Sequence, residues 1–313
     1  MNTTTISPQQ ARRLALAGQR LGSSDATING KEEIAQTIEA LGYVQIDTIS
    51  VVARAHHNAL WVRHPDYTPQ MLDELLAEDR RIYEYWGHAA SYLPMDDFRF
   101  TLPIKERHRQ PPTNKWQQER MEKCGHLLEP VLERIRAEGP LRSQDFEPPP
   151  GTRRGTWWDW KPAKTALELL FWRGDLMISE RRGFQRVYDL TERVLPAHID
   201  TRMPDEDELG QFLVRQALSA HGLAPSVEIR DHLRAADRRV TDAALTGMMQ
   251  CGEVLPLQVE GVEMVSYFAL ATALERIDDP SPEPEVSLLS PFDNAIIQRK
   301  PLEQIYEFLY TLE

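Results

Sequence analysis

A glutamine and an aspartate two residues apart are the side chains best placed for chemistry. Gln45 and Asp47 lie in the run Tyr43–Ser50 (YVQIDTIS), a short β-prone stretch between two helix-like segments. Side chains two apart on a strand share a face, so the two polar groups are predicted to project together while Val44 and Ile46 point into a core. Such a pair can hold a water, whose proton the carboxylate takes, or stabilise a nearby cation. The alternative is that Asp47 caps the next helix and Gln45 is simply solvated.

The composition bounds the class of protein. The chain has 313 residues, of which 41% are hydrophobic and 27% charged, which predicts a folded, soluble protein of two or three domains. We find no apolar run long enough to span a bilayer and no secretion signal at the N-terminus. The two cysteines, Cys124 and Cys251, have no metal-ligand pattern around them. We therefore expect free thiols, a cytoplasmic location, no metal and no cofactor.

The charge is acidic overall but uneven. A net charge of −12 argues against a generic nucleic-acid binder. Residues 99–123, however, hold seven Lys/Arg against three Glu. A second basic segment, residues 151–164, holds Arg153, Arg154, Lys161 and Lys164 against Asp159, around the cluster Trp157-Trp158-Asp159-Trp160. These basic segments are compatible with phosphate contact, and the tryptophans with stacking on a distorted base or with packing between units.

Three passes of helices followed by a β-hairpin recur along the chain. Helices are predicted over Ile6–Leu21, Lys31–Leu41, Val51–Val62, from Thr68, over His126–Ala137, Leu141–Phe146, Pro162–Trp172, Asp207–Ala220, Ser226–Arg234 and Thr241–Cys251. Hairpins are predicted over Arg81–Trp86 with Ala89–Pro94, Asp175–Ser179 with Phe184–Leu190, and Glu253–Val259 with Glu263–Phe268. Ala295–Gln298 and the segment from Phe308 are β-like.

Three helices closed by a two-stranded wing form a winged-helix arrangement. We therefore predict a mainly α fold with β-hairpins (α+β), built from three tandem winged-helix domains at 1–100, 101–198 and 199–275. Residues 276–313 are interpreted as an acidic, Pro-rich linker and the start of a C-terminal β segment. The alternative is a single helical domain with incidental hairpins.

Three motifs accompany the repeated units: Val44-Gln-Ile-Asp-Thr-Ile49, Ala53-Arg-Ala-His-His-Asn-Ala-Leu-Trp61 and Leu289-Ser-Pro-Phe-Asp-Asn294. Together, the units and these motifs resemble the YcaQ/AlkX-like DNA glycosylases, relatives of AlkZ. The resemblance covers essentially the whole chain. It implies three winged-helix domains in a concave C shape, followed by a C-terminal β-barrel that we expect to be truncated here. It also implies that Gln45 and Asp47 form the catalytic Gln-Φ-Asp motif.

The activity implied by this resemblance is removal of N7-alkylguanine from double-stranded DNA and unhooking of N7-linked interstrand crosslinks. No lysine for a Schiff base lies in the motif, so we predict a monofunctional glycosylase, acting as a monomer away from membranes. The side chains expected to contact DNA are Arg54, His56, His57, Arg63, Arg153, Arg154, Lys161, Arg181, Arg182 and Asp293. For His56 and His57, helix packing is the alternative.

Two other functions fit the sequence. Winged helices bind DNA in regulators far more often than they catalyse, and a fold does not decide a function. A non-catalytic DNA-binding regulator, which usually reads a palindrome as a dimer, is therefore the main alternative. The acidic net charge favours a third possibility, a protein-interaction scaffold. Release of free alkylated base distinguishes the glycosylase from both.

Overall fold

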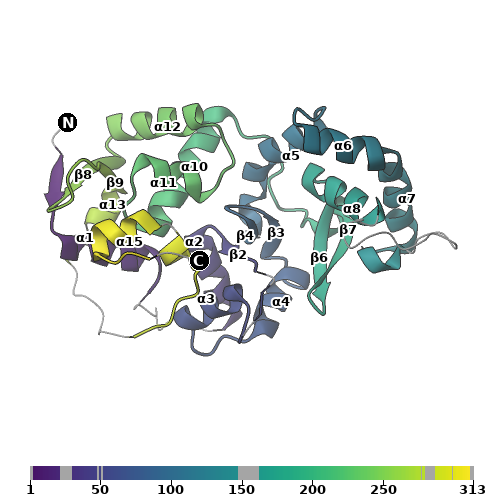
Figure 1. The fold of residues 1–313 in the computed structure, drawn as a ribbon, viewed down its shortest axis with the longest axis horizontal. Coiled ribbons are helices and arrows are strands. Elements are labelled where there is room, and N and C mark those ends of the chain that lie inside the picture. Colours follow the sequence, from purple (N-terminus) through teal and green to yellow (C-terminus); the bar gives the residue numbers. More distant parts are fainter. Residues whose placement is uncertain are drawn as a thin grey trace.

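The computed structural model describes residues 3–21, 30–47, 49–50, 52–146, 162–275, 277–278, 286–297 and 299–310. Helices surround three small sheets of three strands each, so the predicted mixture of helices and β-hairpins is confirmed. In the view of Figure 1 the body is elongated, with the N- and C-terminal segments on the same side. Within these ranges no helix has both the length and the apolar character needed to cross a bilayer.

The elements follow one another in three groups. The first holds β1 (Thr4–Ile6), α1 (Pro8–Gly18), α2 (Lys31–Leu41), β2 (Val44–Gln45), α3 (Ala55–Arg63), α4 (Pro69–Ala77), β3 (Ile82–Trp86), β4 (Ala90–Pro94) and the 3-10 helix η1 (Met95–Thr101). The second holds α5 (Leu102–Arg109), α6 (Lys115–Cys124), η2 (Gly125–Leu127), α7 (Leu128–Glu138), β5 (Leu141–Arg142), η3 (Ser143–Asp145), α8 (Pro162–Arg173), β6 (Leu176–Arg182), β7 (Gln185–Leu190) and α9 (Thr191–Val194). The third holds α10 (Glu206–His221), α11 (Ser226–His232), α12 (Arg238–Gln250), β8 (Val254–Val259), β9 (Tyr267–Leu270), α13 (Ala271–Leu274), α14 (Asn294–Ile297) and α15 (Arg299–Tyr306).

All three predicted hairpins are present as antiparallel pairs: β3 with β4, β6 with β7, and β8 with β9. The last strand begins at Tyr267 and not at Glu263 as predicted, because the turn between β8 and β9 is longer than a tight hairpin turn. A short third strand completes each sheet. In the first two sheets it is β2 beside β4 and β5 beside β7.

The third sheet is completed by the N-terminus. Strand β1 pairs in parallel with β8, with Ile6 opposite Val259. The prediction of a helix from Ile6 was therefore wrong at its start: residues 4–6 are extended, and the helix begins at Pro8 after the capping residue Ser7. Helix α1 consequently packs on the third group of elements, in a cluster that joins Leu14 to Leu223.

Helices α1 and α10 approach so closely that only glycine fits at one point of contact. Gly222 ends α10 with φ +71°, and a Cβ placed on it would lie 2.0 Å from the carbonyl oxygen of Leu14. Positive φ alone costs a side chain about 1 kcal/mol, and overpacking adds about 1–3 kcal/mol more. Because Gly222 has both a positive φ and this close contact with Leu14, one added methyl group should disturb the packing of α1 on α10.

We expect Gly222→Ala to lower the free energy of unfolding by about 3 kcal/mol, measured by urea denaturation. Gly252→Ala is the matched control, because Gly252 has φ +80° but no atom within 4 Å of its added Cβ; it should cost about 1 kcal/mol. Equal losses in the two variants would contradict the close contact between α1 and α10.

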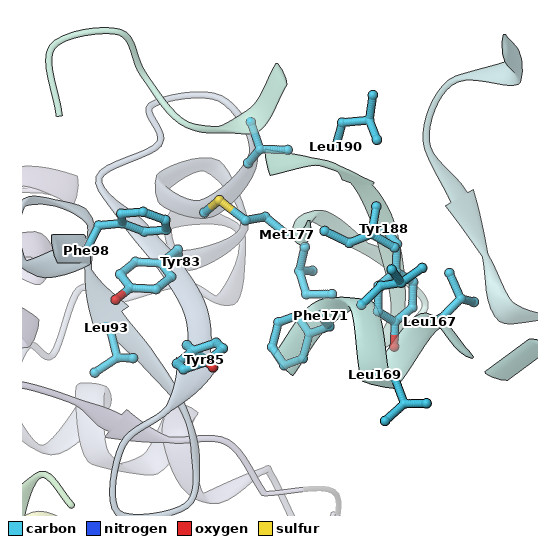
Figure 2. Close-up of a cluster of buried hydrophobic side chains, with 14 of the residues drawn as sticks. Tyr83, Tyr85, Leu93, Phe98, Leu167, Leu169, Phe171, Met177, Tyr188 and Leu190 are labelled. Carbon is cyan, nitrogen blue, oxygen red and sulfur yellow. The ribbon is translucent and has the colours of Figure 1, made fainter. Parts of the chain in front are cut away.

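The first and second groups share a hydrophobic core. Figure 2 shows Tyr83, Tyr85 and Phe98 facing Phe171 and Met177 from the second group. The rings of Tyr85 and Phe171 lie 5.5 Å apart, and the Tyr85 hydroxyl donates to the carbonyl oxygen of Trp172 at 2.6 Å. Such buried aromatic contacts hold helix α8 of the second group against the sheet that carries Gln45.

Several other predicted elements differ from the structure. Helix α3 begins at Ala55, not Val51, because its first backbone hydrogen bonds run to the carbonyl oxygen of Arg54. The helix predicted over Leu141–Phe146 is only partly present: Leu141–Arg142 is strand β5, paired with β7, and Ser143–Asp145 is the 3-10 helix η3. The strand predicted from Ala295 is wrong over residues 295–297, because Asn294–Ile297 is the helix α14. The carboxylate of Asp293 accepts a hydrogen bond from the amide of Ala295 at its start. Residues 307–310 form neither helix nor strand, and none of the sheets in the described ranges closes into a barrel.

Candidate functional site

The Gln-Φ-Asp motif lies at the edge of the first sheet. Gln45 pairs with Ser91 of β4, and the amide of Ile46 donates to the carbonyl oxygen of Ala90 at 2.8 Å. The Gln45 side chain is half-buried, and its Oε1 has no hydrogen-bond partner among the described residues. A buried amide oxygen without a partner is costly and is commonly found where a ligand or water is handled.

Asp47 stands just beyond the strand. β2 ends at Gln45, so the predicted strand over Val44–Asp47 was too long and the two side chains do not share one strand face. Instead, Oδ1 of Asp47 accepts from the amide of Ile49 at 3.1 Å, in a local turn. The carboxylate does not cap α3, whose capping residue is Arg54. It remains half-exposed beside Ile49, whose side chain is 63% exposed.

Aromatic and basic side chains gather behind the motif. His56, at the start of α3, is 1% exposed, and its ring lies 5.8 Å from that of Tyr92 on β4. Phe184, at the tip of the hairpin β6–β7, stacks on His56 with ring centroids 6.1 Å apart and planes 8° apart. The guanidinium of Arg54 lies 3.7 Å from the centre of the Phe184 ring. The hairpin β6–β7 of the second group thus reaches α3, the helix that follows the motif.

The two histidines of α3 are held neutral. Burial, with smaller contributions from His57, Arg181 and Arg54, lowers the pKa of His56 to about 3. Burial and Arg54 lower the pKa of His57 to about 4, and its Nδ1 lies 2.7 Å from the Tyr67 hydroxyl. At neutral pH these imidazoles therefore add no positive charge to the neighbourhood of Asp47.

One buried carboxylate anchors the second hairpin to the first. Glu84 on β3 has a side chain with 0% exposure. It forms an ion pair with Arg181 of β6 and accepts from Nε of Arg186 of β7 at 3.0 Å. Arg181 also donates to the carbonyl oxygen of Phe184 at 2.9 Å, which fixes the hairpin tip. Arg181 was predicted to contact DNA; its side chain is only 7% exposed, and it instead holds the hairpin in place.

Arg63 and Asp293 were also predicted to contact DNA, and the structure corrects both. Nη1 and Nη2 of Arg63 donate to the two carboxylate oxygens of Asp293 at 2.8 and 2.9 Å. Both side chains have 0% exposure, so neither can reach a phosphate. The adjacent Asn294 donates to the carbonyl oxygen of Tyr43 at 3.0 Å, two residues before Gln45. The Ser290–Asn294 segment therefore packs against the start of the motif, through Asn294 and the backbone of Tyr43.

A family model described as DNA glycosylase AlkZ-like matches residues 38–313. This span is most of the chain and includes the Gln-Φ-Asp motif, α3 and the Asp293 segment. The chain belongs to the AlkZ-like family of DNA glycosylases. The resemblance to AlkZ-related DNA glycosylases inferred from the sequence is thereby confirmed.

Among solved structures, this AlkZ-like chain is similar to the Streptomyces sahachiroi DNA glycosylase AlkZ. The TM-score is 0.67 and the sequence identity 16%, with 96% of this chain and 82% of that chain covered. At this identity the match establishes a shared fold. The arrangement of helices and small sheets is thus that of a known glycosylase.

The remaining predicted contact residues of the AlkZ-like chain differ in position. Arg182 is exposed at the end of β6, where its Nη2 lies 2.5 Å from Oε1 of Glu180. Its side chain is therefore accessible to a DNA duplex. Arg54 is half-exposed over Phe184, whereas His56 is buried in helix packing, the alternative considered for it. Arg153, Arg154 and Lys161, with the neighbouring tryptophans, lie outside the described residues. The sequence analysis did not predict a role for Phe184. The feature that could have indicated one is a large aromatic residue directly after Gly183 in a turn, where Phe184 adopts φ +66°.

Because His56 is neutral when folded and protonates when unfolded, acid should destabilise the protein. Its folded pKa lies below the unfolded value of 6.5, so the free energy of unfolding is fully retained above pH 6.5 and decreases as the pH falls toward about 3. Between pH 6.5 and 5 this one group accounts for about 2 kcal/mol. We expect His56→Phe to flatten that part of the profile in urea unfolding from pH 7.5 to 5. An unchanged slope would contradict the buried, neutral imidazole.

Proposed function

We propose that the chain is a monofunctional DNA glycosylase that hydrolyses the N-glycosidic bond of N7-alkylguanine and unhooks N7-linked interstrand crosslinks. The observation that carries the proposal is the motif itself: a half-exposed carboxylate, Asp47, two residues after a glutamine whose Oε1 has no partner among the described residues. Family membership makes DNA the substrate.

The chemistry needs little from the protein beyond charge and a positioned water. N7-alkylguanine carries a positive charge, so it leaves with the electrons of the C1′–N9 bond and becomes neutral without protonation. Asp47 stabilises the oxocarbenium-like sugar and accepts the proton of the attacking water, and Gln45 accepts a hydrogen bond from that water. Water adds to C1′, and the products are free base and an abasic site.

The electrostatics of the neighbouring helix suit a cationic lesion. A protonated histidine beside Asp47 would repel both the alkylated base and the developing sugar cation. Burial keeps His56 and His57 neutral. Arg54, the guanidinium at the start of α3, lies over the Phe184 ring and interacts with its π face. The carboxylate thus faces the lesion with its charge largely uncompensated by these side chains.

The exposure of the motif suits a lesion that cannot leave the duplex. A crosslinked guanine is tethered to the opposite strand, so it cannot swing fully into a closed pocket as most glycosylase substrates do. Asp47 is half-exposed, and the adjacent Ile49 and Val52 are 63% and 96% exposed. We infer that the enzyme meets its lesion on an open surface, without complete extrusion of the base.

The architecture fits this mode of binding. We interpret the three groups of helices with their hairpins as three winged-helix domains, with boundaries near residues 100 and 198 and the N-terminal strand added to the third. Three such units in one chain bind along a duplex without a dimer. The protein is therefore proposed to act as a monomer on double-stranded DNA.

Two substrates test the proposal together. The full chain is incubated with a duplex containing N7-methylguanine and with a duplex crosslinked by a nitrogen mustard through N7. We expect alkali-labile abasic sites in the first and separated strands in the second. Binding of both duplexes without either product would leave a non-catalytic DNA-binding protein.

A further inference from the structure

A pocket lies beside the basic segment 99–123, which the proposed mechanism does not use. It is formed by the end of α5, the turn over residues 110–112, α6 and α8, and has a volume of about 340 Å³. A nucleoside monophosphate occupies roughly 300 Å³, at the small end of ligand pockets. The residues that line it do not include Gln45 or Asp47. The pocket is thus a separate candidate site of suitable size.

The charge of this pocket is positive. Arg107, Arg109 and Arg173 line it, and no carboxylate does. Two carboxylates outside the lining offset part of this charge: Asp175 lies 3.3 Å from Arg109 and 3.0 Å from Arg173, and Glu106 lies 3.9 Å from Arg109. Arg107 is the least neutralised, since its carboxylate neighbour Asp237 is 4.0 Å away and both side chains are mostly exposed. Guanidinium groups in this setting bind phosphate with two parallel hydrogen bonds.

Two tilted aromatic rings line the pocket: the ring of His108 lies 5.6 Å from that of Trp172, with a 30° angle between planes. Trp116 lies outside the lining, 5.7 Å from Trp172 with a 40° angle between planes, and is 54% exposed. Burial and Arg107 lower the pKa of His108, which keeps the ring neutral. Bases stack readily on exposed aromatic faces of this kind.

We propose that this pocket binds a phosphorylated nucleoside, with its base on the His108–Trp172 face and its phosphate on Arg107 and Arg109. Two sources share that chemistry: a free nucleotide, and an unpaired nucleotide of bound DNA. The case of an unpaired DNA nucleotide rests on the proposed function, but only because it requires the protein to bind DNA. The Trp172 carbonyl oxygen accepts from Tyr85 on β3, so the pocket is joined directly to the sheet that carries the motif.

The test is a calorimetric titration of the full chain with dAMP, with deoxyadenosine and with inorganic phosphate. We expect dAMP to bind at least about tenfold more tightly than either part alone, because stacking and phosphate contacts add. Arg107→Glu should weaken dAMP binding by at least about tenfold. Arg136→Glu is the matched control, since Arg136 on α7 is 55% exposed and lies 3.9 Å from its carboxylate neighbour Glu129; its effect should stay below about twofold.

A parallel binding experiment with DNA distinguishes a free nucleotide from an unpaired nucleotide of bound DNA. If the nucleotide belongs to DNA, the chain prefers a duplex with one unpaired adenosine over a fully paired duplex, and Arg107→Glu removes that preference. If it is free, dAMP binds without any such preference. Asp47→Asn should leave the dAMP titration unchanged, so failure of base release does not affect this result. Equal binding of phosphate and dAMP, or equal effects of Arg107→Glu and Arg136→Glu, would overturn the proposal.

Discussion

Replacing Asp47 by asparagine should lower the rate of N7-methylguanine excision by about 10³-fold or more, because the side chain loses both its negative charge and its ability to accept a proton. DNA affinity should change by less than about twofold, since removal of one carboxylate relieves rather than adds repulsion toward phosphates. The measurement is single-turnover base release, with the dissociation constant for the same duplex determined in parallel.

Asp66→Asn is the matched control. Asp66 is an exposed carboxylate in the turn after α3, so the variant removes the same charge away from the motif. We expect it to excise at the wild-type rate. An Asp47→Asn enzyme that releases base as fast as the Asp66→Asn enzyme would remove Asp47 from the mechanism.

The largest loss of stability should follow from Asp293→Asn. The change keeps the size of the side chain but leaves the guanidinium of Arg63 buried without its countercharge. Breaking one partner of a buried ion pair costs about 3–5 kcal/mol. Arg63 would retain its hydrogen bonds to the carbonyl oxygens of Gln19 and Ala59, which do not neutralise it. Urea denaturation at neutral pH measures the effect.

An exposed pair provides the comparison. Arg134 and Glu138 form an ion pair of similar length, 2.8 Å, on the surface of α7. Glu138→Gln should therefore cost less than about 0.5 kcal/mol. The double variant Arg63→Met/Asp293→Leu should be more stable than Asp293→Asn, because it leaves no unpaired charge. A loss for Asp293→Asn no greater than that for Glu138→Gln would contradict the buried pair.

The hairpins could be predicted from the sequence because their signals are local. Gly87, Gly183 and Gly261 each stand in a turn between two β-prone runs, and strands so close in sequence pair with little loss of chain entropy. Strand β1 could not be predicted, since its partner β8 lies about 250 residues away and Thr4–Ile6 is too short to have a pattern. Likewise β5 reads as part of a helix until β7 is placed beside it.

The site was predicted in its residue types but not in its surroundings. The Gln45–Asp47 spacing pointed to paired polar groups, yet the turn that ends β2 at Gln45 depends on pairing with β4. Charge alone could not separate Arg63 and Arg181, which are buried in ion pairs, from the exposed Arg182, because their partners Asp293 and Glu84 are distant in sequence. Long-range pairing therefore decides which arginines are available to DNA.

Quantifying free base by mass spectrometry tests the central claim most directly. The full chain is mixed in excess with a duplex containing one N7-methylguanine, and free N7-methylguanine and abasic sites are counted over time. We predict that the two appear in equal amounts, with no strand break before alkali treatment. A duplex that is bound but retains its alkylated base, with no abasic sites formed, would contradict the assignment of this chain as a DNA glycosylase.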